Sequence, residues 1–115
     1  VERIVEKSLI KTGIINLSIL HTSASLIIQE NADPDVARDI LLFFEKLVPE
    51  NNLYFHSSEG YDDMPAHLRS ILTQSNITLS IKNKKLVIGK WQGIFLFEHR
   101  NFPKNRLIYI HIIGD

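Results

Sequence analysis

Cysteine is absent from this chain of 115 residues. Its absence excludes a disulfide scaffold and any thiolate metal ligand or nucleophile, and it fits a reducing, cytoplasmic setting. Long apolar runs are also absent, since none approaches the ~20 residues that span a bilayer. The first residues, VERIVEK, are too charged for the apolar core of a signal peptide. We therefore expect no membrane partner.

The chain also lacks an excess of either charge, because 13 lysines and arginines balance 13 aspartates and glutamates and the formal net charge is zero. A dedicated nucleic-acid binder needs an excess of positive charge, so we expect no nucleic-acid partner. Little net repulsion also makes a small domain prone to self-association. With 44% hydrophobic and 23% charged residues, the composition is that of one globular domain over residues 1–115.

Hydrophobic periodicity predicts three helices and six strands. The first helix covers 1–11. A second opens at Asp33-Pro34-Asp35, where an aspartate cap precedes a proline, and it ends at Pro49. A short third helix starts at Pro65. The strands are expected at 14–20, 25–29, 77–81, 86–88, 94–98 and 107–113. Short turns between the later strands favour an α+β fold of two layers, with mostly antiparallel strands and packed helices.

The first candidate for chemistry is His21-Thr22-Ser23, at the end of a predicted strand. Histidine binds metals and moves protons near neutral pH, and the hydroxyls of Thr22 and Ser23 suit a phosphate. The plainer interpretation is an ordinary polar turn. Glu30 and Asn31 form a second candidate, since they would face the same pocket near a helix N-terminus that favours an anion. Asp33 in that segment is expected to cap the helix.

The third candidate is the segment HSSEGYDDMPAH, residues 56–67. It is dense in metal-binding groups, which are His56, Glu59, Asp62, Asp63 and His67. Imidazole suits zinc, and carboxylates suit magnesium, manganese or calcium. Their spacing matches no zinc motif, however, and a solvated acidic loop remains the alternative.

Other patterns in the sequence are weaker evidence for a function. A triad of Ser23, His67 and Asp62 lacks the glycine pattern of a nucleophile elbow. GKWQG at 89–93 lacks the spacing of a phosphate loop. Trp91 is a core, interface or stacking residue. Arg100 and Arg106 lie either in a solvated loop or in contact with an anion.

Taken together, three blocks resemble the YjbQ family, also described as secondary thiamine-phosphate synthases. The blocks are HTSASLIIQENADPDVARD, HSSEGYDDMPAHLRSIL and LVIGKWQGIFLFEHR, and the resemblance runs from about Ile4 to Gly114. It implies a homotrimer with a pocket at the subunit interface, lined by the histidine motifs. It also implies a divalent metal, zinc or magnesium, and a phosphorylated small-molecule ligand.

The resemblance assigns roles by motif. His21, His56, His67 and Glu59 would be catalytic, and His21, His56, His67 and Asp62 would hold the metal. The ligand would be bound by Thr22, Ser23, Glu30, Asn31, Trp91 and Arg100, with help from Arg106. Two features depart from the family pattern. The resemblance leads us to expect a further strand before the first helix, which residues 1–115 do not include, and the acidic loop reads DDMPAH in place of a shorter form.

Three functions follow as hypotheses. The first is a transferase that joins a pyrimidine methyl diphosphate to a thiazole phosphate and releases pyrophosphate, helped by a cation that neutralises the leaving group. The second is a trimeric accessory protein that binds metal or phosphate without that chemistry. The third is a metal-dependent hydrolase, in which three histidine ligands leave one position open.

Overall fold

The computed structural model describes residues 1–50 and 53–115, and it has the expected α+β composition. The elements in chain order are α1 (Glu2–Ser8), β1 (Thr12–Ile19), β2 (Ala24–Glu30), α2 (Pro34–Leu47), α3 (Asp63–Leu72), β3 (Asn76–Lys82), β4 (Lys85–Leu86), β5 (Gln92–Glu98) and β6 (Ile108–Gly114). Every strand pair is antiparallel, as predicted. In this described part, no helix is long and apolar enough to cross a membrane.

Four strands form one sheet in the order β4-β3-β1-β6, with β1 at its centre. Alternate residues of β1, namely Ile15, Leu17 and Ile19, are buried, because a strand sends successive side chains to opposite faces. They form the core with Ile77 and Ile81 of β3. The alternation in the sequence therefore locates the core correctly.

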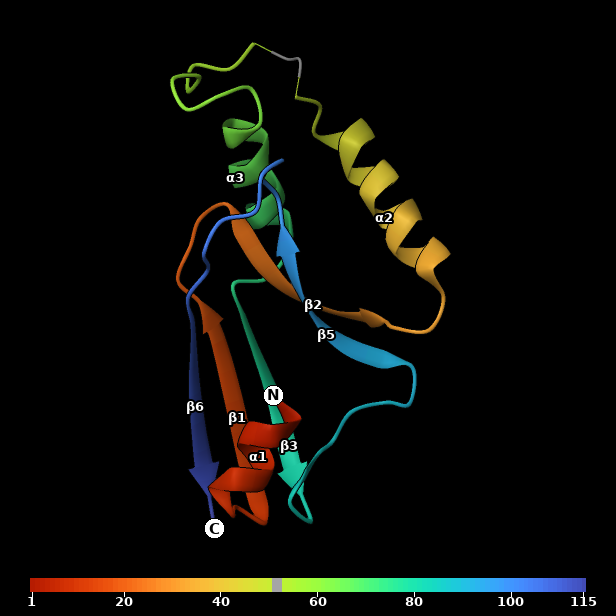
Figure 1. The fold of residues 1–115 in the computed structure, drawn as a ribbon, viewed down its shortest axis with the longest axis vertical. Coiled ribbons are helices and arrows are strands. Elements are labelled where there is room, and N and C mark those ends of the chain that lie inside the picture. Colours follow the sequence, from red (N-terminus) through yellow and green to blue (C-terminus); the bar gives the residue numbers. More distant parts are fainter. Residues whose placement is uncertain (51–52) are drawn as a thin grey trace.

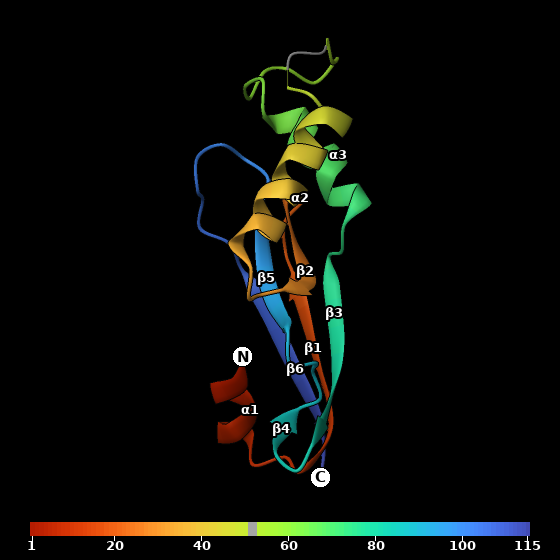
Figure 2. The same cartoon turned by 90° about the vertical axis from the view of Figure 1, so that its right-hand side faces the viewer.

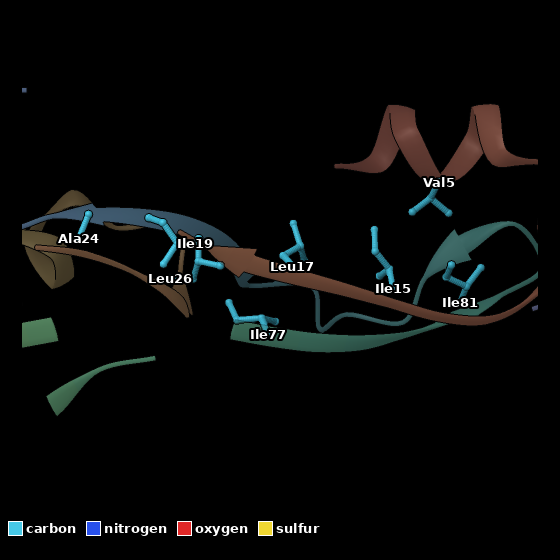
Figure 3. Packing of buried hydrophobic residues seen from close by; sticks show 8 residues of the cluster. All are labelled: Val5, Ile15, Leu17, Ile19, Ala24, Leu26, Ile77 and Ile81. Carbon is cyan, nitrogen blue, oxygen red and sulfur yellow. The ribbon is translucent and has the colours of Figure 1, made fainter. Parts of the chain in front are cut away.

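Helix α1 covers one face of this sheet (Figure 3), and its single buried side chain, Val5, points toward Ile15 and Ile81. The helix ends earlier than the predicted stop at Gly13. Leu9 adopts a left-handed conformation with φ of 61° and closes the last turn through its N–H to the Glu6 carbonyl. Gly13 instead lies within β1 opposite Gly114, where an added Cβ would lie 2.1 Å from the Ile113 oxygen. This glycine is thus required by close strand contact.

The remaining two strands, β2 and β5, pair with each other and form a two-stranded ribbon that extends toward α2 and α3 (Figure 1). Their register sets Ala24 opposite Glu98 at one end and Glu30 opposite Gln92 at the other. Figure 2 shows both helices at the end of the molecule opposite α1. This register therefore determines that the segments before β2 and after β5 lie at one end of the ribbon, and the segments after β2 and before β5 lie at the other.

Helix α2 begins as predicted, with the Asp33 carboxylate accepting a hydrogen bond from the Asp35 N–H and Pro34 in the first turn. None of its residues is buried, although Ile40, Phe43 and Phe44 line a groove of about 710 Å³ beneath it. The radius of gyration is 16.3 Å, against about 13 Å for a compact domain of this length. The subunit alone is elongated and leaves apolar surface uncovered.

The boundaries of α3 and β4 also differ from the predictions. Helix α3 begins at Asp63, two residues before Pro65, because a proline is tolerated anywhere in a first turn whose N–H groups lack helical partners. Strand β4 has only two residues, 85–86, where 86–88 was expected. The lysine-rich turn before it is confirmed, with positive φ at Asn83 and Lys84.

Candidate metal centre

A histidine–carboxylate cluster lies at the start of α3. The Oδ2 atom of Asp63 is 2.6 Å from Nε2 of His56 and 3.1 Å from Nε2 of His67. Ligand atoms of these three residues all lie within 4.8 Å of one another. The Asp63 side chain is only 3% exposed, whereas both imidazoles are partly open. Imidazole nitrogens and a carboxylate oxygen form a donor set that suits a divalent cation.

The helix explains how two of these residues meet. Asp63 and His67 are four positions apart on α3, and residues at this spacing lie on the same face of a helix. His56 comes from the loop before α3 and reaches the same carboxylate oxygen. A helical spacing and one loop residue therefore build the cluster.

The backbone between β1 and β2 sets the tautomer of His67. Its Nδ1 lies 2.9 Å from the Thr22 carbonyl oxygen, which can only accept, so Nδ1 carries a proton. In a neutral His67, Nε2 then has a lone pair that faces the Asp63 carboxylate. Two acceptors at 3.1 Å repel unless His67 is protonated or a cation lies between them. The geometry thus fits a metal ligand oriented by a carbonyl behind it.

Arg100, two residues after β5, connects both aspartates. Its Nε donates to Asp62 Oδ2 at 2.9 Å, its Nη1 donates to Asp63 Oδ1 at 2.7 Å, and its Nη2 donates to the Glu59 carbonyl. The hydrogen bond with Asp62 raises the pKa of Arg100 and lowers the pKa of Asp62. Arg100 therefore fixes the unused oxygen of Asp63 and leaves Oδ2 turned to the histidines.

The protonation states of the cluster follow from these contacts. Burial acts to raise the pKa of Asp63, but the hydrogen bond from His56 and the charges of His67 and Arg100 outweigh it and lower that pKa to about 2. The same hydrogen bond to Asp63 raises the pKa of His56 above 6.5. Asp63 is consequently a carboxylate at neutral pH, ready to ligate a cation.

The other residues proposed for the metal and for catalysis lie nearby in different roles. Glu59 Oε2 is 3.4 Å from His56 Nε2, at the edge of the cluster. Asp62 faces Arg100 and the Asn101 N–H rather than the histidines. His21 is not in the group, because its Nε2 accepts from the Leu107 N–H at 2.7 Å.

The residues proposed for ligand binding divide between the two ends of the ribbon. The Thr22 carbonyl contacts His67 Nδ1, and the Ser23 hydroxyl accepts a hydrogen bond from Arg106 Nη1. Arg106 also donates from its Nε to Glu98. Both lie at the end of the ribbon near α3.

Glu30, Asn31 and Trp91 lie at the opposite end, where the Asn31 N–H donates to the Trp91 carbonyl. A seven-residue strand spans about 20 Å, so within one subunit these three residues do not join the cluster.

Asp63 is the residue that sequence reasoning left out of the metal ligands, where Asp62 was chosen. The signal was present, because the pair Asp63 and His67 has the four-residue helical spacing and Asp62 does not. Starting the helix at Pro65 concealed it, since Asp63 then fell in a loop.

Fold and site define a small α+β protein with a histidine–carboxylate cluster where a helix begins beside a two-stranded ribbon. Its sequence matches the family model YjbQ, described as UPF0047 protein YjbQ-like, over residues 1–115. The chain belongs to this family, which confirms the resemblance noted in its motifs.

Named relatives agree with this assignment. UPF0047 protein sll1880 of Synechocystis is 51% identical over 100% of this chain and 79% of its own length. YjbQ of Salmonella typhimurium is 46% identical over 92% of this chain and 77% of its own. A crystal structure of a YjbQ/UPF0047 family protein from Clostridium acetobutylicum superposes with a TM-score of 0.90 at 36% identity, covering 98% of this chain and 84% of that one.

Proposed function

We propose that this protein binds a divalent cation at His56, Asp63 and His67 and uses it to act on a phosphorylated small molecule. The observation that carries the proposal is the pair of nitrogens, His56 Nε2 and His67 Nε2, converging on one buried carboxylate oxygen. With His67 held in a tautomer whose lone pair faces that oxygen, a cation would satisfy all three groups. When bound, such a cation supplies charge neutralisation to a leaving phosphate.

The donor set favours zinc over magnesium, because magnesium prefers oxygen ligands and binds few imidazoles. Three protein donors also leave coordination positions open, which is typical of catalytic rather than structural zinc sites. This observation keeps a metal-dependent hydrolase as the second candidate function. Arg100 acts here as a positioning residue, since all three of its nitrogens donate to protein groups.

The specific reaction that we propose is the one implied by the family resemblance. The thiazole phosphate joins the methyl carbon of the pyrimidine methyl diphosphate, the bond from that carbon to the diphosphate oxygen breaks, and pyrophosphate leaves. His56, Asp63 and His67 would hold a cation, which would supply charge neutralisation to the leaving diphosphate. Asp63 would carry the negative charge of the site, with Arg100 fixing its orientation.

Metal binding is tested by calorimetric titration of the chelator-treated protein with zinc and with magnesium. We expect zinc to bind at one site per chain, with at least tenfold weaker binding in His56→Ala, Asp63→Asn and His67→Ala. His111→Ala, which alters a histidine on β6, is the matched control and should bind like the unmodified protein. Equal binding by all variants would remove the metal site.

Activity is tested separately, by incubating the zinc-loaded protein with both thiamine precursors and measuring thiamine phosphate and pyrophosphate. Product formation that is lost in His67→Ala supports the synthase. Zinc binding without product leaves the accessory binding protein as the function. Phosphate release from a simple phosphomonoester, lost in the same variant, favours the hydrolase.

We also propose that the protein assembles as a homotrimer. Its elongated subunit, the absence of buried residues in α2 and the apolar groove beneath α2 support self-association, because apolar patches of this kind mark interaction surfaces. The number of three subunits comes from the family resemblance. Light scattering coupled to size-exclusion chromatography should give three times the 13.2 kDa chain mass. A monomeric mass at micromolar concentration would overturn the assembly.

A further inference from the structure

Two segments lie beside α3 (Figure 1), and each supplies one contact to a proposed metal ligand. The β1–β2 turn, residues 20–23, provides the Thr22 carbonyl, which lies 2.9 Å from His67 Nδ1. The β5–β6 loop, residues 99–107, provides Arg100, whose Nη1 donates to one oxygen of the aspartate ligand at 2.7 Å. A contact that holds the turn and the loop together therefore affects the orientation of both ligands.

Glu98, the last residue of β5, binds both ends of the β5–β6 loop through one carboxylate. Its Oε2 accepts a hydrogen bond from the Arg100 N–H at 3.1 Å, and its Oε1 accepts from Arg106 Nε at 2.8 Å. Arg106 Nη2 also donates to Oε2, which makes the contact bidentate, and the Lys104 N–H donates to Oε1 at 3.4 Å. The carboxylate thus fixes the backbone from which the Arg100 side chain extends.

Arg106 connects this carboxylate to the β1–β2 turn. Its Nη1 donates to the Ser23 hydroxyl at 3.1 Å, and its Nη2 donates to the Ser23 carbonyl at 3.3 Å. Ser23 is itself buried. The Thr22 carbonyl and the Ser23 nitrogen belong to one planar peptide unit, so holding Ser23 in place restricts the direction of the Thr22 carbonyl. All three nitrogens of Arg106 are thereby engaged within the protein.

The ion pair between Glu98 and Arg106 is largely buried. The Arg106 side chain is 6% exposed and the Glu98 side chain is 21% exposed, whereas Arg38 and Asp35, which pair on α2, are 76% and 71% exposed. Burial acts to raise the pKa of Glu98, but the hydrogen bonds from Arg106 and from the backbone outweigh it and lower that pKa. Glu98 is consequently charged at neutral pH. A bidentate pair with little solvent around it holds its geometry better than an exposed pair.

We propose that Glu98 and Arg106 are positioning residues for the metal centre. Their ion pair holds the β1–β2 turn and the β5–β6 loop together, and it acts on the ligands through the Thr22 carbonyl and through Arg100. This inference rests on the proposed cation site and deepens it, because the pair affects the ligands through residues that contact them. Loss of the pair should leave the ligands in place but orient them less well, and the affinity for the cation should fall.

The test removes both charges at once, in the double variant Glu98→Leu/Arg106→Met. Replacing a whole buried ion pair with apolar residues often costs little stability, whereas removing one partner leaves a buried charge. Backbone hydrogen bonds between the turn and the loop remain in this variant. Zinc binding is measured by calorimetric titration of the chelator-treated full chain, and thermal unfolding is measured without metal. We expect the variant to stay folded and its zinc affinity to fall about tenfold, as for other outer-shell partners of metal ligands.

Arg38→Met, which breaks the exposed ion pair of α2, is the matched control and should bind zinc like the unmodified protein. Arg106→Lys keeps the charge, but an ammonium lacks the planar fork that donates to Glu98 and Ser23 together, so it should retain only part of the affinity. Cobalt in place of zinc adds a spectroscopic measurement, because the visible absorption of the bound ion depends on ligand geometry. This absorption should change in the double variant and stay unchanged in Arg38→Met.

A double variant with unchanged zinc affinity and an unchanged cobalt spectrum would overturn the inference and leave the cation site in place, even if its melting temperature fell. The pair would then serve the fold alone. Absence of zinc binding by the unmodified protein would instead remove the cation site, and the inference with it. An equal loss of affinity in Arg38→Met would also overturn the inference, because any lost ion pair would then have the same effect.

Discussion

Asp63 Oδ2 lies 3.1 Å from His67 Nε2, one helical turn further along α3. The opposite oxygen, Oδ1, accepts from Arg100 Nη1 at 2.7 Å. One oxygen of the Asp63 carboxylate thus contacts the Arg100 guanidinium, and the other contacts His67. The second ring nitrogen of His67 contacts the Thr22 carbonyl. The two oxygens have different tasks, and this difference distinguishes Asp63 from its neighbour Asp62.

Replacing each aspartate separately tests that distinction. Asp63→Asn should reduce zinc affinity by tenfold or more, because it removes the charge of a ligand. Asp62→Asn should reduce it less, since Asp62 contacts Arg100 and the Asn101 N–H rather than either histidine. Calorimetry on the two variants measures both values, and a larger effect of Asp62→Asn would place the cation on the other aspartate.

Zinc binding should strengthen as pH rises. The hydrogen bond to Asp63 raises the pKa of His56 above 6.5, so its neutral, metal-binding form becomes abundant only above that raised value. In the metal-free protein, the contribution of His56 to folding stability has the opposite dependence and falls as pH rises. The His56–Asp63 pair stabilises the fold fully below pH 6.5, and this contribution is lost as pH rises through the raised pKa. Titrations between pH 5.5 and 8.5 would contradict the model if zinc affinity were flat.

His99 should make the metal-free protein lose stability in mild acid. Burial lowers its pKa from 6.5 to about 4 in the fold, so between these values the unfolded chain binds a proton that the folded chain does not. The free energy of unfolding should then fall as pH drops from 6.5 to 4, by at most about 3 kcal/mol. Urea unfolding measures it.

The control for this pH dependence is a histidine exchange elsewhere. His99→Gln should flatten the dependence between pH 4 and 6.5, and His111→Gln should keep it. If both variants retain the same dependence, other groups cause it.

Adjacent isoleucines of β1 test the core. Ile15 is 0% exposed and Ile14 is 44% exposed, on opposite faces of one strand. Ile15→Ala should cost about 2–5 kcal/mol through lost contacts and a residual cavity, and Ile14→Ala less than about 1 kcal/mol. Urea unfolding at low protein concentration compares them. Equal costs would mean that the Ile14 face is also covered in solution.

The sequence predicts the elements of this fold well because each has a local cause. Alternating isoleucines and leucines mark β1, and Asp33 with Pro34 marks the start of α2. The division into two sheets has no local cause. It depends on β2 pairing with β5, in which paired residues are 62 to 74 positions apart, and no short-range pattern encodes that choice.

The candidate site shows the same limit. His56 and His67 were found from their residue type, and they do meet. His21 has the same chemistry, yet the Leu107 N–H occupies its Nε2, a contact across 86 positions.

Helix α2 has no buried residue, whereas β1 is bonded to a strand on each side. In a single subunit, local unfolding should therefore require much less free energy for α2 than for β1. Backbone amides of α2 should exchange with deuterium through local opening, well before those of β1, which exchange only when the whole domain unfolds. Assembly that covers α2 would then slow the exchange of α2 without altering that of β1.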